Sequence, residues 1–463
     1  MPKDHALYRL TTKERMAAGK KIRGKVPRSS HAKWAAARNR PDPIELLKAS
    51  DRERLPALLP IRYARMCASP FAFLRGAAAL MAADLASTRV TGMRVQACGD
   101  CHVANFGGFG TPERQLVFDI NDFDETLPAP WEWDVKRLAV SIVLATREAG
   151  IGERHSLDAV RAAVESYRKR IHEYAEMAAM EVWYSHLDLE ILAEKAKSPA
   201  ARKRWLKTID KAAQRTPGFE FPKITAMHNG LPRIADRPPL IYHPREMASI
   251  GEHVRQMFHR YQETLPHDRR IVLDRYELVD IARKVVGIGS VGTRCAVALL
   301  MAGPRDALVL QFKEARRSVL EPYVGKSRYA NQGERVVVGQ RMLQSASDAF
   351  LGWTRDDAGH DYYFRQLRDM RMKVDVESMS KADWFEYVEL CGWALARGHA
   401  RTGDPARIAG YLGEGDAFDE AIEKFGVVYA EQTERDYAAL LKAVRAGRIR
   451  VRPRSAARRT RHG

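Results

Sequence analysis

Residues 98–134 read CGDCHVANFGGFGTPERQLVFDINDFDETLPAPWEWD, and this stretch decides the predicted fold. Its first part spells G-D-x-H-x-x-N with Gly99, Asp100, His102 and Asn105. A strand-like LVFDI run follows, and after it come Asn121, Asp122, Phe123 and Asp124. A carboxylate, an amide five residues later and a second carboxylate after a short strand form the spacing that phosphoryl-transfer sites use.

This spacing suits a division of chemical roles. In phosphoryl transfer the first acid orients or deprotonates the attacking group, while the amide and the second acid hold Mg²⁺ against nucleotide phosphates. Because Mg²⁺ prefers hard oxygen ligands and keeps several waters, two protein groups are enough. A competing interpretation is that Asp, Asn and Gly gather here because all three favour turns.

The sequence of this stretch resembles those of two known families. GDCHVANF followed by a D-F acid resembles the catalytic and metal loops of the aminoglycoside- and choline-kinase branch of the protein-kinase-like fold. Five segments of the chain are similar to the bacterial family called domain of unknown function 2252: SPFAFLRGAAALMAADLA, CGDCHVANFGGFG, FDINDFDET, WEWDVKRLA and GIGSVGTR. This second resemblance covers most of the chain and implies no substrate.

The kinase-like resemblance implies roles for individual residues. Asp100 would be the catalytic acid or base and Asn105 a metal ligand, with His102 in structural support. Asp119 lies closer to the usual distance after Asn105 for the second metal ligand, but we prefer Asp122 because a Phe follows it. Asp122 also sits better relative to Asp134, which resembles the buried helix Asp that supports the catalytic loop in those kinases.

The same stretch fits a competing motif. Residues 98–102 read C-x-x-C-H, the pattern of c-type haem attachment, and C-x-x-C alone also occurs in thioredoxin-like redox sites. Haem attachment requires export, and the polar N-terminus has no apolar core of the kind a signal peptide needs. We therefore interpret the two thiols as incidental to the function.

Composition limits the class of protein. The 463 residues carry a net charge of +19, which favours acidic partners such as nucleotide phosphates, RNA, DNA or an anionic membrane surface, although part of the excess lies in the tails. Five cysteines, few and odd in number, favour a reducing compartment. No apolar run approaches the roughly 18–20 residues needed to cross a bilayer. We expect a cytoplasmic protein without a membrane span.

A second informative stretch contains G-x-G-x-x-G at Gly287, Gly289 and Gly292, with Ser290 inside it. In a Rossmann unit the third glycine opens a helix, whereas in a kinase the glycines join two antiparallel strands over the phosphates, and a Lys on the next strand pairs with them. ALVLQFKEA supplies such a lysine, Lys313. Glu314 beside it keeps a ribose-binding interpretation open, but the upstream acids favour the kinase-like one.

A kinase also needs a helix acid that holds this lysine. Glu334, in the helical pattern RYANQGERVVVGQRML, is our candidate, and Glu321 is its rival. The next segment, DAFLGWTRDDAGHDYYFRQLRDMRMKV, reads as a hairpin with a polar turn. The order of these parts is inverted, because the glycines, Lys and Glu follow the catalytic acid here. We expect a circular permutation of the lobes, which is feasible where domain termini lie close together.

The prediction is an α+β protein with a two-lobed protein-kinase-like fold. We divide the chain into a basic extension (1–43), a mainly helical lobe with the catalytic and metal loops (44–270), a small β-rich lobe (271–378), returning helices (379–448) and a disordered Arg-rich tail (449–463). It would use ATP and Mg²⁺ to transfer a phosphoryl or adenylyl group to an unknown small-molecule or protein acceptor. The alternatives are a non-catalytic nucleotide- or RNA-binding protein, with nucleic acid held by the basic tails, and an NAD-dependent oxidoreductase.

Overall fold

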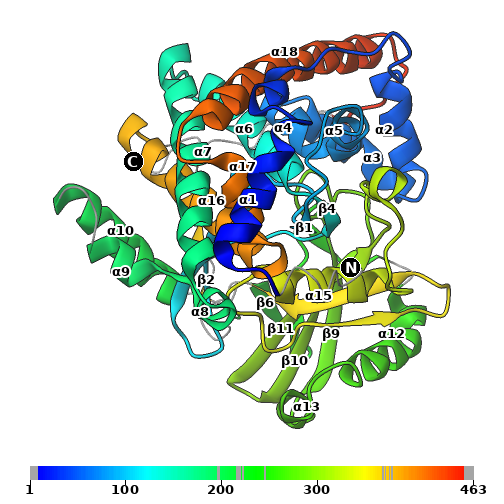
Figure 1. The fold of residues 1–463 in the computed structure, drawn as a ribbon. Coiled ribbons are helices and arrows are strands. Elements are labelled where there is room, and N and C mark those ends of the chain that lie inside the picture. The colour runs from blue at the N-terminus through cyan, green and yellow to red at the C-terminus, as the bar shows by residue number, and fades with distance from the viewer. Residues whose placement is uncertain are drawn as a thin grey trace.

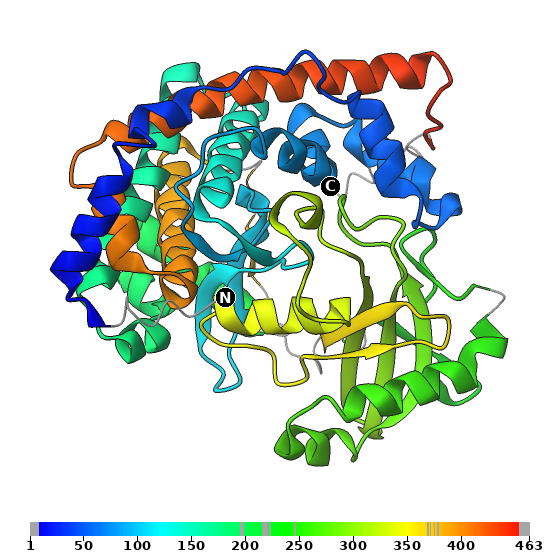
Figure 2. The same cartoon turned by 45° about the vertical axis from the view of Figure 1, so that its right-hand side comes forward.

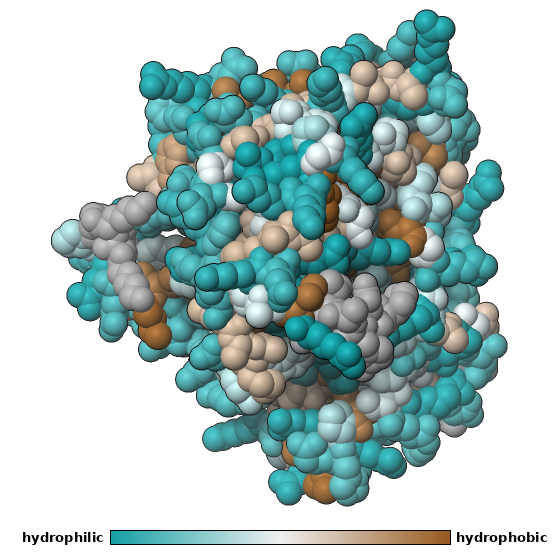
Figure 3. Space-filling model, in the orientation of Figure 1, coloured by the Kyte–Doolittle hydropathy of each residue, from teal (hydrophilic) through white to brown (hydrophobic). Residues whose placement is uncertain are grey.

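The computed structural model describes residues 9–194, 199–214, 221, 224–244, 247–367, 370, 372–374, 376 and 379–452. Helices make up one part of the molecule, and a six-stranded sheet with its own helices makes up the other (Figure 1). The face seen in Figure 3 is mostly hydrophilic, with hydrophobic residues in small separate patches. None of the described helices combines the length and the apolarity needed to cross a membrane.

The helical part is built around four long helices whose apolar faces form the largest core cluster. α7 and α16 pack closely, because a Cβ on Gly392 would collide with the backbone of α7. The helices of this part are α1 (Thr12–Ile22), α2 (Pro43–Asp51), α3 (Leu59–Met66), α4 (Pro70–Gly76), α5 (Ala78–Leu85), α6 (Trp131–Glu148), α7 (Glu153–Glu176), α8 (Ala179–Tyr184), α9 (Leu189–Glu194), α10 (Pro199–Ala213), α16 (Lys381–Thr402), α17 (Pro405–Leu412) and α18 (Ala417–Arg445).

Short antiparallel strands inside the helical part position the loops of the 98–134 stretch. β1 (Arg94–Ala97) pairs with β4 (Leu127–Pro130), and a second sheet has the order β14-β2-β3-β5. Its strands are β2 (Phe106–Gly110), β3 (Leu116–Ile120), β5 (Leu187–Asp188) and β14 (Met372–Lys373). Because β1 leads to β2 and β3 leads to β4, the two loops that connect the sheets, 98–105 and 121–126, lie next to each other.

The larger sheet has the order β12-β13-β11-β10-β9-β8, and every neighbouring pair is antiparallel. Its strands are β8 (Ile241–Tyr242), β9 (Glu277–Lys284), β10 (Cys295–Gly303), β11 (Asp306–Ala315), β12 (Gly352–Arg355) and β13 (Asp361–Gln366). Side chains alternate along β11: Leu310 and Phe312 pack under α12 (Met247–Gln262), whereas Val309 belongs to the core of the opposite face.

The remaining elements cover the sheet and join it to the helices. The hairpin of β6 (Thr225–His228) and β7 (Leu231–Ile234) packs through Ile234 on the face opposite α12. The other helices are α13 (His267–Leu273), α14 (Glu321–Val324) and α15 (Gln332–Leu343). α15, yellow in Figure 2, lies between the sheet and the helical part.

The β-rich part of the molecule agrees with one sequence prediction and differs from another. The hairpin expected after residue 348 is present as β12 and β13. The boundary expected after residue 270 is too late, because β8 pairs with β9 and α12 packs on the same sheet. Tyr261 of α12 stacks on Phe364 of β13, and Phe258 meets the same ring edge-to-face. These contacts assign α12 to the β-rich part.

The basic N-terminal extension packs against the C-terminal helices, with α1 on α17 and residues 28–32 on α18. Arg23 and Arg28 donate to the last carbonyls of α17, at 2.9 Å to Tyr411 O and 2.6 Å to Leu412 O. These cations satisfy acceptors that a helix C-terminus leaves unpaired. The predicted disordered tail, 449–463, begins too early, because Ile449 is buried in a core cluster and the backbone N–H of Arg452 donates to Pro60 O at 3.0 Å. The rest of that tail, 453–463, lies outside the described residues.

Candidate functional site

The acid–amide loop, residues 98–105, joins β1 to β2 and is fixed by a buried carboxylate. Asp134 accepts hydrogen bonds from the backbone N–H groups of Cys98, at 2.6 Å, and Gly99, at 2.9 Å. His399 Nε2 lies 3.3 Å from the same carboxylate. Gly99 has φ +83°, and a Cβ there would collide with the carbonyl of Glu125. Asp134 therefore holds the backbone of this loop in place.

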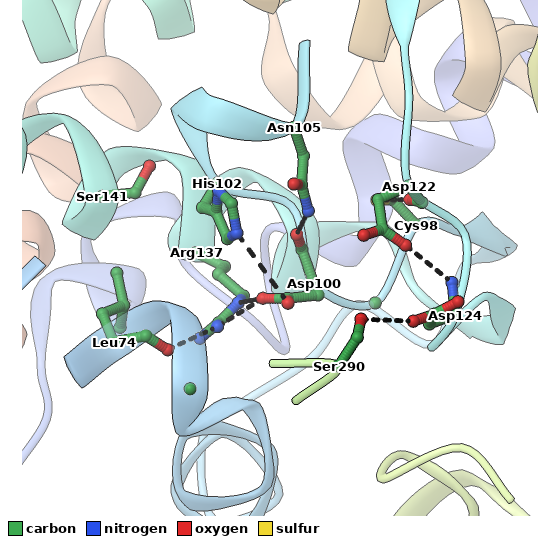
Figure 4. A network of polar contacts seen from close by, with 12 residues as sticks. Leu74, Cys98, Asp100, His102, Asn105, Asp122, Asp124, Arg137, Ser141 and Ser290 are labelled. Carbon is green, nitrogen blue, oxygen red and sulfur yellow. Dashed lines mark hydrogen bonds and ion pairs between the residues drawn. The ribbon is translucent and has the colours of Figure 1, made fainter. Parts of the chain in front are cut away.

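Asp100 points from this loop toward an arginine (Figure 4). Arg137 Nε donates to Asp100 Oδ1 at 2.7 Å, and His102 Nε2 lies 3.9 Å from Oδ2. Burial raises the pKa of Asp100, although Arg137 opposes the shift. Burial also holds the pKa of His102 well below its usual value, and Arg75 and Arg137 add to this effect, so His102 is neutral at pH 7. A carboxylate whose pKa is raised is a stronger base than an ordinary one, and Arg137 fixes its orientation.

Asn105 lies beside Asp100 in the same loop. Its Nδ2 donates to the backbone carbonyl of Asp100 at 2.8 Å, which directs the side chain toward the acid (Figure 4). Asn105 and Asp100 both line one cavity of about 180 Å³, which we call the central cavity.

The structure separates the two acids between which the sequence left a choice. Asp119 is fully buried and accepts two hydrogen bonds from Arg397, at 2.7 and 2.8 Å, as well as one from the backbone of Ser345. It does not line the central cavity, whereas Asp122 does. Asp119 is therefore corrected to a structural acid, because its lone pairs are already used by Arg397.

The glycine loop, residues 287–292, joins β9 to β10, which are antiparallel. Gly287 and Gly292 have φ values of +61° and +94°, a region that side chains with a Cβ rarely adopt. Gly289 leaves room for the backbone of Arg75, since a Cβ would lie 3.1 Å from its carbonyl oxygen. The loop runs into a strand and not into a helix, so the geometry that a Rossmann dinucleotide site requires is missing here.

Asp124 is the point where the glycine-loop segment meets the 98–134 segment. Lys313, on β11, forms an ion pair with its Oδ2, and Ser290 of the glycine loop donates to the same oxygen at 3.1 Å. Tyr363 donates to Oδ1 at 2.9 Å, and Lys313 Nζ is 2.5 Å from Ser290 Oγ. Burial opposes ionisation of both partners, but the pair lowers the pKa of Asp124 and raises that of Lys313.

The structure does not bring Glu334 to Lys313. The backbone N–H of Glu334 donates to Asn331 Oδ1 at 3.1 Å, which caps α15, while the neighbouring Arg335 points inward. Arg335 donates to the carbonyls of Asp124, at 2.8 Å, and Thr126, at 2.7 Å. Glu321, the other candidate acid for holding Lys313, accepts a hydrogen bond from the backbone N–H of Ser327 at 3.4 Å. Within the described residues the acid that holds Lys313 is Asp124, not an acid of α15.

Arginines form the other wall of the central cavity. Arg62 is fully buried, pairs with Asp51 and donates to Gly76 O at 2.7 Å. Arg54 donates to Val291 O at 2.7 Å, and Arg65 donates to Gly287 O, so both hold the glycine loop. Burial and the charges of Arg62 and Arg316 lower the pKa of Arg54 to about 9.

The donor set fits Mg²⁺ better than a thiolate or imidazole metal. Asp122 and Asn105 supply hard oxygens toward one cavity, and Mg²⁺ completes its shell with water and phosphate. In the described part of the chain no three His, Cys, Asp or Glu side chains are close enough to form a metal cluster by themselves. Cys101 is fully buried, and burial raises its pKa well above the ordinary value, which disfavours the reactive thiolate.

Sequence reasoning missed three of the residues that define this geometry. Asp124 was part of the motif but received no role, and its pairing with Lys313 depends on contact between distant segments. Arg137 follows Asp134 by three residues on α6, so both side chains lie on the same helix face and contact the acid–amide loop. This spacing could have identified Arg137 from the sequence. Tyr363 had no signal beyond its place in an aromatic strand.

Comparison with known proteins gives one match. A family model described as "Uncharacterized protein conserved in bacteria (DUF2252)" matches residues 54–443, which include both loops and the six-stranded sheet. No curated protein matched the chain. No solved structure matched it.

Proposed function

The chain belongs to the DUF2252 family of uncharacterised bacterial proteins, and we propose that it is an ATP- and Mg²⁺-dependent phosphotransferase of protein-kinase-like architecture. The observation that carries this proposal is that the glycine loop and Lys313 meet Asp124 of the loop 121–126, in a cavity that Asp100 and Asn105 of the acid–amide loop also line. A glycine loop between antiparallel strands, followed by a lysine on the next strand, is the arrangement by which kinases hold phosphates.

Asp122, Asn105 and the glycine loop, which line the central cavity, and the buried Lys313 beside Asp124 would each have a defined task. ATP would supply the phosphoryl group, and Mg²⁺ would neutralise the charge that develops on it. Asp122 and Asn105 would hold the metal through their oxygens. The backbone of the glycine loop and Lys313, which is cationic at neutral pH because its pKa is raised, would bind the phosphates. Positive charge that is already in place stabilises a transferring phosphoryl group without reorganisation.

Asp100 would act on the acceptor. Its carboxylate would orient the acceptor hydroxyl and take its proton, as the acceptor oxygen bonds to phosphorus and the bond to the departing nucleotide breaks. Arg137 fixes the orientation of this carboxylate. The same groups would serve adenylyl transfer, and the two reactions differ in their second product, ADP or pyrophosphate.

The proposal includes a circularly permuted order of the lobes. The acid–amide loop comes before the glycine loop in the chain, opposite to the order in the kinases that it resembles. α16, α17 and α18 return to the helical part after the sheet, so the sheet is inserted within the helical part in sequence. This connectivity brings both loops to one cavity without requiring the usual order.

A direct test is transfer of label from ATP carrying ³²P in its γ-phosphate to a bacterial small-molecule extract, in the presence of Mg²⁺. We expect a labelled product with the wild type and a loss of about 10²–10⁴-fold with Asp100→Asn, the range for a general base. Asp100→Asn preserves the size of the side chain, so nucleotide binding should persist. Equal transfer by wild type and variant would exclude Asp100 as the base, and ATP binding with no transfer by either would favour a non-catalytic role.

A further inference from the structure

A second cavity, which we call the side cavity, lies apart from the central one. It has a volume of about 600 Å³ and is bounded by α8, by β1 and β4, and by the residues that follow α14. Residues 124–128 separate the two cavities: Asp124 lines the central cavity, whereas Leu127 and Pro128 line the side cavity. The proposed phosphotransferase uses none of its lining residues.

The side cavity is strongly cationic. Within the described residues its lining contains no Asp or Glu, but it contains five cations, Arg94, Lys326, Arg328, Arg335 and Arg401. Three of these cations donate to neutral backbone carbonyls: Arg94 to Val324 O at 2.9 Å, Arg335 to Thr126 O at 2.7 Å, and Arg401 to Gln344 O. A carbonyl dipole satisfies the donor but leaves the charge, so positive potential accumulates in the cavity.

Aromatic rings line the same cavity. Trp183 is 45% exposed although it is among the largest apolar side chains, and the guanidinium carbon of Arg401 lies 3.8 Å from the centroid of its ring. Arg328 lies 4.9 Å from the ring centroid of Tyr329 and donates to its hydroxyl at 2.6 Å. Exposed rings beside cations form the platform on which a base stacks while its phosphate is held.

A structural role alone accounts for only part of this arrangement. It explains why Arg94 and Arg401 contact carbonyls, since these bonds fix β4, α14 and the end of α15. It does not explain Lys326 and Arg328, which are exposed on the same wall without an acidic partner among the described residues. Burial and the neighbouring Arg397 lower the pKa of Arg401 to about 10, and a bound anion would relieve the repulsion while Arg401 keeps its charge at pH 7.

We propose that the side cavity is a binding site for a phosphate ester that carries an aromatic base, that is, a nucleotide. Lys326 and Arg328 hold the phosphate, and the base stacks against Trp183. Two sources share this chemistry, a free nucleotide and the terminal nucleotide of an RNA. The site does not depend on the proposed phosphotransferase activity, because its residues lie outside the central cavity.

The test is titration of the full-length protein with AMP, which has no γ-phosphate to transfer, monitored by calorimetry and by tryptophan fluorescence. We expect binding that the double variant Lys326→Ala/Arg328→Ala weakens about tenfold or more, since each lost charged contact removes a substantial part of the affinity. The control Lys203→Ala/Lys207→Ala removes the same charge from α10 and should bind as the wild type. Trp183→Phe should remove the fluorescence change.

Further measurements distinguish the side cavity from the central cavity, and a free nucleotide from an RNA terminus. Asp122→Ala alters the central cavity and should leave AMP binding intact; loss of binding in this variant would assign AMP to the central cavity and overturn the proposal. Equal affinity of the wild type and the Lys326→Ala/Arg328→Ala variant would also overturn it, as would absence of AMP binding. A 5′-phosphorylated oligoribonucleotide that competes with AMP and binds more tightly would identify RNA as the source, and weaker binding would identify the free nucleotide.

Discussion

Replacing Asp119 by alanine would expose the difference between the two acids that the sequence could not separate. Asp119 and Arg397 both have 0% exposed side chains, and the guanidinium donates to both carboxylate oxygens and to Leu343 O. Asp119→Ala would leave Arg397 as a buried charge without its counterion. Removing one partner of such a pair costs about 3–5 kcal/mol of the free energy of unfolding.

That cost predicts a measurable shift. If the 463-residue chain unfolds cooperatively, its entropy of unfolding near the midpoint is about 1 kcal/mol/K, from about 2.1 cal/mol/K per residue. The midpoint of thermal unfolding should therefore fall by about 3–5 °C. Urea titration gives an independent value, because the denaturation midpoint should fall while its slope is unchanged.

Two controls show whether the buried charge is the cause. Asp122→Ala removes a carboxylate of the central cavity and should change the thermal midpoint much less. The double variant Asp119→Leu/Arg397→Met replaces both charges by apolar groups of similar size and should recover most of the loss. The reasoning would be refuted if Asp119→Ala unfolds like the wild type, or if Asp122→Ala costs as much.

Three further variants test the packing and the electrostatics. Gly392→Ala places a Cβ against the backbone of α7 and should cost about 1–3 kcal/mol of stability in urea unfolding, with a neutral result contradicting the close helix contact. Lys313→Met removes the ammonium that lowers the pKa of Asp124. In the wild type the ion pair stabilises the folded state above the pKa that Asp124 has in the unfolded chain, and this stabilisation is lost as the pH falls through the lower folded-state pKa. The variant should therefore lose less free energy of unfolding on acidification than the wild type. Arg137→Gln removes the charge that opposes the raised pKa of Asp100, so the acid limb of kcat/KM for phosphoryl transfer should move to higher pH; an unchanged limb would exclude Asp100 as its source.

Local sequence patterns predicted those elements that local interactions determine. The hairpin of β12 and β13 followed from an alternating aromatic run and a polar turn, and the acid–amide loop followed from the spacing of Asp100 and Asn105. Asp134 was assigned to loop support by resemblance, and its carboxylate contacts the loop backbone. The hairpin and the acid–amide loop depend on residues that are close in sequence, whereas Asp134 lies 35 residues after Gly99.

Features that depend on distant segments were not accessible in the same way. The role of Asp119, on strand β3, is determined by Arg397, which lies on α16 far along the chain. The partner of Lys313 is Asp124 rather than Glu334, because α15 turns Arg335 and not Glu334 toward the acids. A helix pattern fixes which residues share a face but does not fix which face meets the sheet.

The measurement that tests the central claim most directly is the thermal midpoint of the full-length protein with ATP, with and without Mg²⁺, for the wild type and Asp122→Ala. A ligand that binds only the folded state at 100 times its Kd adds about 2.7 kcal/mol, enough to raise the midpoint visibly. We predict a rise that requires Mg²⁺ and is lost in Asp122→Ala. No rise with the wild type at millimolar ATP, or a rise that persists unchanged in the variant, would contradict a nucleotide–metal site in the central cavity.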